Sequence, residues 1–220
     1  LRVWRDVDIC PPITGRGNGL RATPEQVAAS LAQEAADVQP GRYAPEALSF
    51  FSPRVPVHEM EAFGAGWFQV QDEAAQLIGI FTGPRPGEQV LDACAGLGGK
   101  TCHLAQLLPE GAELLAVEPS AYRIRLLTQN LERLHLAGRV KQFQGRLEDY
   151  AAAQPGLFAR ILVDAPCSGT GVIGRHPDIR WNRKPEDLPV YQRQQLVLLE
   201  HARGLLAPDG VLAYVTCSLE

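Results

Sequence analysis

Short apolar runs alternate with stretches of helical periodicity from residue 67 to the end of the chain. One such stretch places four apolar side chains on one helical face, at Ile124, Leu127, Leu131 and Leu134. Gly138 is predicted to end that helix. The run at 161–164 is apolar enough for a strand that is buried on both faces. This alternation predicts a parallel sheet with helices on both of its faces.

The same patterns predict the other elements of this α/β unit. Strands are expected at 88–94, 113–118, 139–144 and 211–216, and helices at 71–81, 99–108 and 191–206. The turn at 83–87 ends the first helix, and Pro208-Asp209-Gly210 is predicted to turn the chain before the last strand. The last helix is expected to direct three side chains toward the sheet: Leu196, Leu199 and Leu206.

The first sixty or so residues follow a different pattern. Thr23-Pro24-Glu25-Gln26 combines an N-cap threonine, a proline at the first helical position and a capping-box glutamine, so a helix is expected to run to about Ala36. A short strand at 47–51 and a loop at 52–58 follow. The sequence therefore predicts a small α+β module at 1–63 and a larger domain at 64–220.

Composition narrows the class of protein. The 220 residues are 45% hydrophobic and 21% charged, which is typical of globular domains, and no apolar run approaches the length of a membrane span. The five cysteines are scattered and form no CxxC pair, so neither a disulfide framework nor a metal site is expected. These features favour a cytoplasmic protein. Because the chain starts at Leu1 and stops just after a strand-like segment, we expect it to be part of a longer protein.

The formal net charge of −4 argues mildly against a nucleic-acid partner. Basic side chains nevertheless cluster between residues 175 and 193, at Arg175, His176, Arg180, Arg183, Lys184 and Arg193. On charge alone, the favoured interpretation of this cluster is a solvated surface.

A glycine-rich turn at 91–101 joins a predicted strand to a predicted helix. It is not a nucleoside triphosphate loop, because Cys94 stands where the first glycine of that motif is needed. It is not a dinucleotide fingerprint either, because Thr101 replaces the third glycine. The pattern that remains is the shorter glycine loop of S-adenosylmethionine enzymes. Glu118 follows Gly98 by twenty positions, where its carboxylate can accept hydrogen bonds from ribose hydroxyls. A plain tight turn with a surface glutamate is the alternative.

Two cysteines follow the predicted fourth and fifth strands. Asp164-Ala165-Pro166-Cys167 leaves one strand and Thr216-Cys217 leaves the other. Ligands of open parallel sheets bind beyond the carboxyl ends of the strands. If the two strands are neighbours, their ends lie about 5 Å apart. A lone cysteine is usually a small buried apolar residue. Two cysteines beside a carboxylate in one cleft instead favour a catalytic role.

These residues resemble the Nol/Nop/Sun RNA cytosine-5 methyltransferases over nearly the whole chain. The resemblance rests on Gly66-Trp67, Gln71-Asp72, the glycine loop, 164–171, Arg175-His176-Pro177-Asp178-Ile179-Arg180-Trp181 and Thr216-Cys217-Ser218. It implies a Rossmann-like class I methyltransferase fold and transfer of a methyl group from S-adenosylmethionine to carbon 5 of a cytosine. It also implies that the target is RNA, with small-subunit ribosomal RNA favoured. The first module and the basic segment after Cys167 are then expected to lie near that RNA.

The resemblance also assigns roles to residues. Cys217 is expected to attack carbon 6 of the cytosine, Cys167 to assist release of the product, and Asp164 to hold the edge of the base. Spacing alone leaves the choice of nucleophile open, because DNA cytosine-5 enzymes use the cysteine that corresponds to Cys167. The residues expected to bind the cofactor are Cys94, Ala95, Gly96, Leu97, Gly98, Gly99, Lys100, Glu118, Arg123, Gln144 and Asp164.

Several positions depart from the family pattern. Gly96-Leu97 replaces the usual Ala-Pro of the loop, Glu118 replaces an aspartate, and Gln144 replaces an aspartate expected near the adenine, which predicts weaker cofactor binding. The family continues beyond Cys217-Ser218 with two more strands, whereas this chain ends at Glu220. Two other functions stay open: a non-catalytic RNA-binding protein of ribosome assembly, and a transfer-RNA or DNA cytosine-5 methyltransferase. The protein is expected to be a monomer without a metal.

Overall fold

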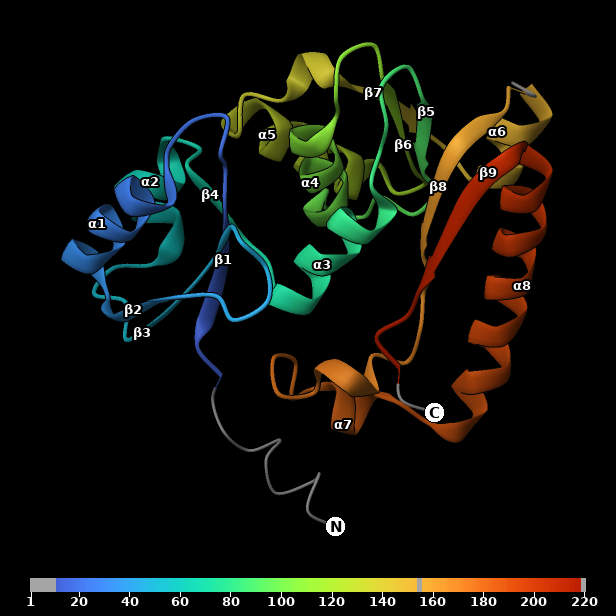
Figure 1. The fold of residues 1–220 in the computed structure, drawn as a ribbon. Coiled ribbons are helices and arrows are strands. Elements are labelled where there is room, and N and C mark those ends of the chain that lie inside the picture. Colours follow the sequence, from blue (N-terminus) through green and yellow to red (C-terminus); the bar gives the residue numbers. More distant parts are fainter. Residues whose placement is uncertain (1–10, 154–155, 219–220) are drawn as a thin grey trace.

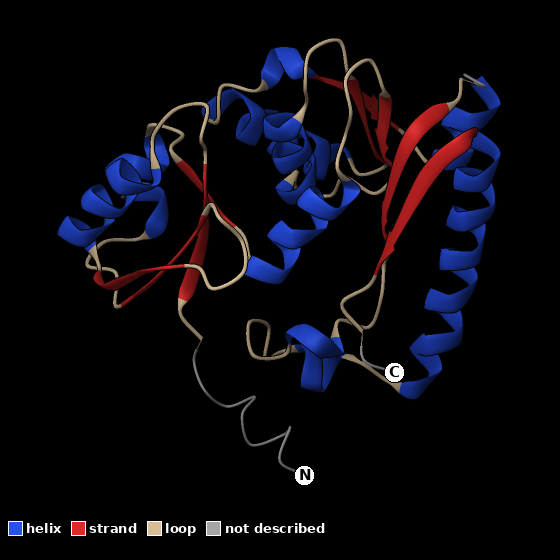
Figure 2. Cartoon of the chain, in the orientation of Figure 1, coloured by secondary structure: helices blue, strands red, loops and turns tan. Residues whose placement is uncertain are grey.

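The chain forms a small antiparallel unit followed by a larger α/β unit (Figure 1, Figure 2). A computed structural model describes residues 11–153 and 156–218. Among these residues, no helix combines the length and the apolar character needed to cross a membrane. Cys10, one of the five cysteines, lies outside the described residues.

The small unit is a four-stranded sheet with two helices. Its strand order is β2-β3-β1-β4, with every pair antiparallel. The strands are β1 (Ile13–Gly17), β2 (Ala36–Pro40), β3 (Ala47–Phe51) and β4 (Phe68–Val70), and the helices are α1 (Pro24–Glu34) and α2 (Glu61–Gly64). Val27, Leu31 and Phe50 belong to its core. The predicted strand at 47–51 and the capping box of α1 are confirmed.

Three strands of the small unit were not predicted. β1 has the sequence Ile-Thr-Gly-Arg-Gly, which carries neither alternation nor an apolar run. β2 is largely exposed and β4 has three residues, so neither leaves a clear pattern. β4 lies beyond the predicted division at residue 63, yet it pairs with β1 in the small sheet.

The large unit is built on five parallel strands in the order β7-β6-β5-β8-β9. The strands are β5 (Gln89–Asp92), β6 (Glu113–Glu118), β7 (Val140–Gln144), β8 (Phe158–Asp164) and β9 (Leu206–Val215). In chain order this is 3-2-1-4-5, which places a switch point of the topology between β5 and β8. The predicted fold class, a Rossmann-like parallel sheet with a small additional module, is confirmed.

Helices cover both faces of this sheet (Figure 2). α3 (Glu73–Thr82), α4 (Gly99–Leu107) and α5 (Ala121–Arg133) contribute to one core layer, and α6 (Leu147–Ala153) and α8 (Leu188–Leu205) to the other. α7 (Ile179–Asn182) follows β8. Short 3-10 helices occupy Val57–Glu59, Ala137–Arg139, Thr170–Val172 and Pro185–Asp187.

The predicted end of α5 at Gly138 is wrong. The helix stops at Arg133, and His135 takes the left-handed conformation with φ +59°. The His135 N–H donates to the Glu132 carbonyl at 3.0 Å and the Leu136 N–H to the Leu131 carbonyl at 2.7 Å. This is a Schellman motif, in which burial of Leu131 and Leu136 compensates for a histidine at a position that favours glycine.

Two predictions around β9 are also wrong. Pro208-Asp209-Gly210 lies inside the strand, where the register with β8 shifts between Phe158 and Arg160. The strand bulges there because proline lacks the N–H that a regular ladder needs. Leu196 is 60% exposed, so it does not face the sheet. The side chains of α8 that contribute to the core are Leu198, Ala202 and Leu205.

Candidate active site

The carboxyl ends of β5, β8 and β9 deliver the candidate residues to one edge of the parallel sheet. The glycine loop follows β5, Asp164 ends β8, and Cys217 comes two residues after β9. β8 and β9 are direct neighbours, with Asp164 paired in register to Val215. The two cysteines, fifty residues apart in sequence, therefore come into side-chain contact, as was expected if the two strands are neighbours.

Two glycines of the loop have backbone conformations that other residues rarely adopt. Gly96 has φ +57° and Gly98 has φ +90°. A Cβ atom at Gly98 would also lie 2.4 Å from Cδ1 of Leu127. The loop can therefore turn into α4 and approach α5 closely only with glycine at position 98.

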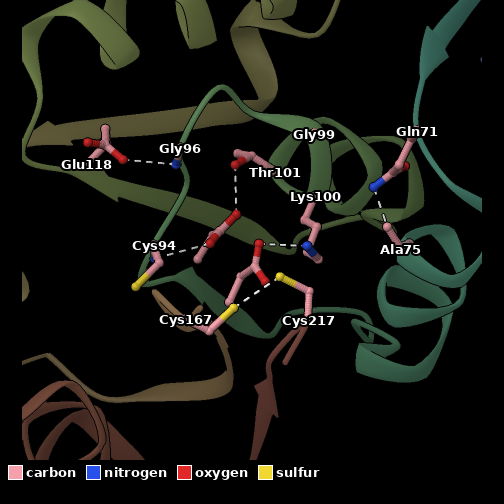
Figure 3. A network of polar contacts seen from close by, with 12 residues as sticks. Gln71, Ala75, Cys94, Gly96, Gly99, Lys100, Thr101, Glu118, Cys167 and Cys217 are labelled. Carbon is pink, nitrogen blue, oxygen red and sulfur yellow. Dashed lines mark hydrogen bonds and ion pairs between the residues drawn. The ribbon is translucent and has the colours of Figure 1, made fainter. Parts of the chain in front are cut away.

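Glu118 is buried at the end of β6 and holds the loop from the side. One carboxylate oxygen accepts the Gly96 N–H at 3.0 Å (Figure 3), and the other accepts the Ser120 N–H at 2.8 Å. Each carboxylate oxygen can accept more than one hydrogen bond. Glu118 is thus fixed in place and still able to receive two hydroxyl donors, which argues against the alternative of a surface glutamate.

Asp92, which was not predicted from the sequence, binds the same loop from the end of β5. Its carboxylate accepts the Thr101 hydroxyl at 2.7 Å and the Cys94 N–H at 3.3 Å, so it binds both ends of the loop. Complete burial raises the pKa of Asp92 to about 6. An aspartate that directly precedes a glycine loop at the end of a buried strand is the signal that could have identified it.

A cavity of about 680 Å³ opens beside the loop. Its size is within the usual range for cofactor sites. Polar groups of the glycine loop and of Glu118 line one part of it, and Leu147, Val197 and Leu198 supply apolar wall. The cavity combines apolar surface with a fixed carboxylate, which fits a purine nucleoside with free ribose hydroxyls.

The predicted cofactor residues do not all reach this cavity. Five of them line it: Cys94, Gly96, Glu118, Arg123 and Asp164. Ala95 is buried, and Leu97 is half exposed with its carbonyl accepting from Asn130. Gln144 is exposed at the end of β7 and is not among the lining residues. Arg146, Leu147 and Glu148 line the cavity from the segment that follows β7, and Arg193 lines it from α8.

Lys100 forms an ion pair with Asp164 at 2.6 Å between Nζ and Oδ2 (Figure 3). The lysine side chain is mostly buried, whereas about a third of the aspartate side chain is exposed. The glycine loop therefore contributes a cation to the end of β8. Lys100 acts on the predicted base-holding carboxylate and does not line the cavity.

The sulfur atoms of Cys167 and Cys217 face each other at 3.0 Å, and both cysteines are free (Figure 3). Their two loops are joined further along, where the Gly171 N–H donates to the Cys217 carbonyl at 2.8 Å. The Ser168 and Ser218 hydroxyls are also 2.8 Å apart. Hydrogen bonds between the two loops thus hold the cysteine pair in place, beside Asp164.

The two thiols have opposite shifts in pKa. Partial burial disfavours the thiolate of Cys167, but hydrogen bonds from Ser218, Cys217 and Thr216 outweigh it and lower the pKa of Cys167 to about 7. Burial, the neighbouring Cys167 and the charge of Asp164 raise the pKa of Cys217 to about 12. These opposite shifts favour a thiolate on Cys167 and a thiol on Cys217, in a pair whose protons are coupled.

The other described cysteines are less suited to nucleophilic chemistry. Burial raises the pKa of Cys94 to about 12 and that of Cys102 to about 11. Reactive cysteines need an accessible thiolate, so the Cys167 and Cys217 pair is the best candidate among the cysteines that the structure describes.

Two arginines of the basic segment bind other parts of the chain. Arg175 pairs with Asp72 and donates to the Pro12 carbonyl and, at 3.2 Å, to the Thr14 hydroxyl. Arg183 Nε donates to the Ser168 carbonyl at 2.8 Å. The segment after Cys167 is therefore attached both to the small unit and to the loop of the cysteine pair.

Arg16, also missed, reaches the glycine loop from β1 of the small unit. It is fully buried, and its guanidinium donates to the Gly99 carbonyl at 3.0 Å, to Gln106 at 2.8 Å and to Gln71. Burial lowers the pKa of Arg16 to about 10. A buried arginine in a short polar strand gives no pattern by which sequence reasoning could find it.

A family model and the curated relatives of this chain agree on one family. A family model described as 16S rRNA methyltransferase RsmB/F matches residues 80–220. Ribosomal RNA small subunit methyltransferase B of Salmonella newport is 42% identical over 175 residues, which is 80% of this chain and 40% of that protein. The Salmonella heidelberg protein of the same name is 44% identical over 177 residues, with the same coverage. The chain spans about 40% of the length of these relatives.

Solved structures share the whole arrangement. The protein PH0851 superposes with a TM-score of 0.92 at 31% identity, over 98% of this chain and 49% of that one. A methyltransferase homolog protein from Pyrococcus horikoshii gives 0.84 at 28% identity, over 100% and 68%. NSun6 from Pyrococcus horikoshii, solved with SFG, gives 0.89 over 100% and 79%, and at 21% identity it supports the fold alone.

Proposed function

The chain belongs to the RsmB/F family of 16S rRNA methyltransferases, and we propose that it methylates carbon 5 of a cytosine in small-subunit ribosomal RNA. The resemblance to the Nol/Nop/Sun enzymes is thereby confirmed. The observation that carries the proposed reaction is the Cys167 and Cys217 pair, 3.0 Å apart, beside the Lys100 and Asp164 ion pair.

The cavity beside the glycine loop is proposed to hold S-adenosylmethionine, which when bound supplies an electrophilic methyl group. Glu118 would receive the ribose hydroxyls, and the backbone of Cys94 and Gly96 would lie against the cofactor. Leu147, Val197 and Leu198 offer an apolar wall for the adenine. Gln144, which is exposed and does not line the cavity, contributes little in this proposal.

The enzyme must supply a nucleophile, because carbon 5 of cytosine is too weak a nucleophile by itself. Cys217 is proposed for this role on the resemblance to the family. Addition of its sulfur to carbon 6 forms an S–C bond and moves the electron pair of the C5–C6 double bond onto carbon 5. The Cys217 proton passes to the Cys167 thiolate across the 3.0 Å contact. The low pKa of Cys167 and the high pKa of Cys217 describe the resting state from which this transfer starts.

Asp164 and Lys100 are proposed to bind the cytosine ring together. Asp164 faces the cavity and would accept a hydrogen bond from the exocyclic amine and from N3 once N3 is protonated, and the Lys100 ammonium offsets negative charge that develops on the ring. This contribution of Lys100 follows from the ion pair and was not expected from the sequence.

Cys167 is proposed to act again when the product is released. After methyl transfer, carbon 5 carries both a methyl group and a proton. Loss of the Cys167 proton to water restores its thiolate, which then takes the carbon 5 proton. The electron pair re-forms the double bond and expels the Cys217 sulfur as a thiolate.

RNA is proposed to lie across both units, with the module at 1–63 contacting it. Support comes from the attachment of the basic segment to the small unit, where Arg175 donates to the Pro12 carbonyl and the Thr14 hydroxyl. The target base must leave its stack to reach the cysteine pair, so an unpaired stretch is expected. We propose that the protein acts in the cytoplasm, where ribosomal RNA is found, and that it works as a monomer.

A methyl-transfer assay tests this function. The chain is incubated with labelled S-adenosylmethionine and, in parallel, with small-subunit ribosomal RNA, transfer RNA and DNA, and modified cytosines are mapped by bisulfite sequencing. Methylation of one cytosine in the ribosomal RNA alone is the expected result. Methylation confined to transfer RNA or to DNA would contradict the proposed substrate.

A non-catalytic RNA-binding protein is the second candidate, favoured by the exposed position of Gln144, which does not line the cavity. Calorimetry separates the two. The enzyme must bind S-adenosylmethionine, and Glu118→Ala must weaken that binding. A folded chain that binds RNA but gives no heat with S-adenosylmethionine would favour the second candidate.

A further inference from the structure

The indole of Trp181 lies in solvent next to the candidate active site. It is 82% exposed, the highest value among the large apolar side chains in the described part of the chain. Single exposed apolar residues are common and need no explanation by themselves. Trp181 differs from other exposed apolar residues because its helix is attached to the loop of Cys167 and because cations are its neighbours in sequence.

α7, which carries Trp181, is attached to the loop of Cys167 on both sides of the tryptophan. Ile179 is buried against Gly169, where an added Cβ would lie 2.9 Å from Cδ1 of Ile179. Arg183 Nε donates to the Ser168 carbonyl at 2.8 Å. Figure 1 shows α7 beyond the carboxyl ends of β8 and β9, near the last described residues. Trp181 is therefore held in a fixed relation to the cysteine pair.

Three cations lie close to Trp181 in sequence. Residues 180–184 read Arg-Trp-Asn-Arg-Lys, and the acids that flank them are Asp178, Glu186 and Asp187. Asp178 accepts from the Asn182 amide at 3.3 Å, and Asp187 accepts from the Lys184 N–H at 2.9 Å. An exposed aromatic ring among cations is the arrangement that binds single-stranded nucleic acid, because the cations contact the phosphates and the ring receives a base. A partner of the opposite charge fits this surface best.

We propose that Trp181 stacks against an unpaired RNA base next to the target cytosine. The inference rests on the proposed function. A cytosine that leaves its stack to reach Cys217 exposes the faces of its neighbours, and an indole can replace the lost stacking. Trp181 would then bind the strand beside the reacting base, and every base could use it because each has a flat face.

Binding of a labelled short single-stranded RNA, followed by fluorescence anisotropy over a range of salt concentrations, tests the proposal. Trp181→Ala should weaken binding roughly five- to hundredfold. Trp181→Phe should restore most of the affinity and Trp181→Leu should not, because leucine keeps apolar surface without a flat ring. Stacking is not electrostatic, so the slope of affinity against salt should stay unchanged in all three variants, whereas Lys184→Met should reduce it.

Phe81→Ala is the matched control, because Phe81 is 80% exposed at the far end of α3 and should not affect RNA binding. Equal RNA affinity of Trp181→Ala and the unmodified chain would overturn the proposal, and so would full affinity in Trp181→Leu. A parallel assay measures the covalent adduct of the unmodified chain with 5-fluorocytosine RNA. An adduct together with unchanged Trp181→Ala binding refutes the stacking role alone, whereas no adduct refutes the proposed function on which it rests.

Discussion

Cys167 and Cys217 differ in pKa although their sulfur atoms are in contact. Cys167 accepts hydrogen bonds from three neighbours, and hydrogen bonds to a charged group favour the charged form. Cys217 is the donor to that thiolate, so its own ionisation would place two negative charges 3.0 Å apart. Before the reaction, the thiolate is therefore favoured on Cys167, whereas the proposed nucleophile is Cys217.

Alkylation by iodoacetamide as a function of pH tests this distribution. Modification of Cys167 should rise with a midpoint near pH 7, as its lowered pKa implies. Cys217→Ala removes one donor to the thiolate, so the pKa of Cys167 and the midpoint should both rise. Peptide mass spectrometry identifies the modified residue. Preferential modification of Cys217 near neutral pH would contradict the distribution.

Several residues of the site act through partners that are remote in sequence. Lys100 and Asp164 are 64 positions apart, and Arg16 and Gly99 are 83 apart. The sequence predicts which residues end the strands, because strand ends follow from apolar runs. It does not predict ion pairs and buried hydrogen bonds, because these depend on how two units pack. Asp164 and the cysteines could thus be predicted, and the position of Asp92 before the glycine loop offered a signal, whereas the contacts of Lys100 and Arg16 could not be predicted.

The elements of the parallel sheet follow closely from the pattern of apolar residues. The strand at 113–118 is observed with the predicted bounds, since a run buried between two helical layers gives a strong signal. α6 and β1 were missed because one is short and the other is polar. The ends of helices and strands were harder to predict where residues other than glycine and proline terminate them.

The end of α5 offers a stability prediction. His135 is exposed and has φ +59°, a conformation that glycine adopts without a Cβ penalty. His135→Gly should raise the free energy of unfolding by about 0.5–1 kcal/mol, after allowance for the greater freedom of glycine in the unfolded chain. Urea unfolding of the variant and of His135→Ala provides the measurement. Equal free energies of unfolding for His135→Gly and His135→Ala would show that backbone strain at position 135 does not lower the stability.

Three arginines join the two units of the molecule. Arg16 reaches the Gly99 carbonyl from the small unit, and Arg175 of the large unit binds the Pro12 carbonyl and the Thr14 hydroxyl. Arg133, from α5, donates to the Phe63 carbonyl at 2.8 Å and the Phe68 carbonyl at 3.1 Å, and its guanidinium lies 3.7 Å from the Phe63 ring centre. Backbone carbonyls are fixed acceptors, so the units are held in one relative position.

Removal of Arg133 should loosen the small unit. Arg133→Met leaves two carbonyls without this donor and should lower the free energy of unfolding by about 2–4 kcal/mol. Amide hydrogen exchange should increase first in β1 and β4 and much less in β5 and β8, because local opening follows lost contacts. Arg133→Lys keeps the charge but not the planar fork, so an intermediate effect is expected. Equal acceleration in both units would mean that Arg133 does not join them specifically.

The central claim is that Cys217 attacks the cytosine and Cys167 assists release. Its most direct test is covalent trapping with 5-fluorocytosine RNA in the presence of S-adenosylmethionine, followed by denaturing gel electrophoresis and mass spectrometry of the linked peptide. We expect an adduct on Cys217 that Cys217→Ala abolishes, and accumulation of adduct with ordinary cytosine RNA in Cys167→Ala. An undiminished adduct in Cys217→Ala, carried by Cys167, would show that Cys217 is not the nucleophile.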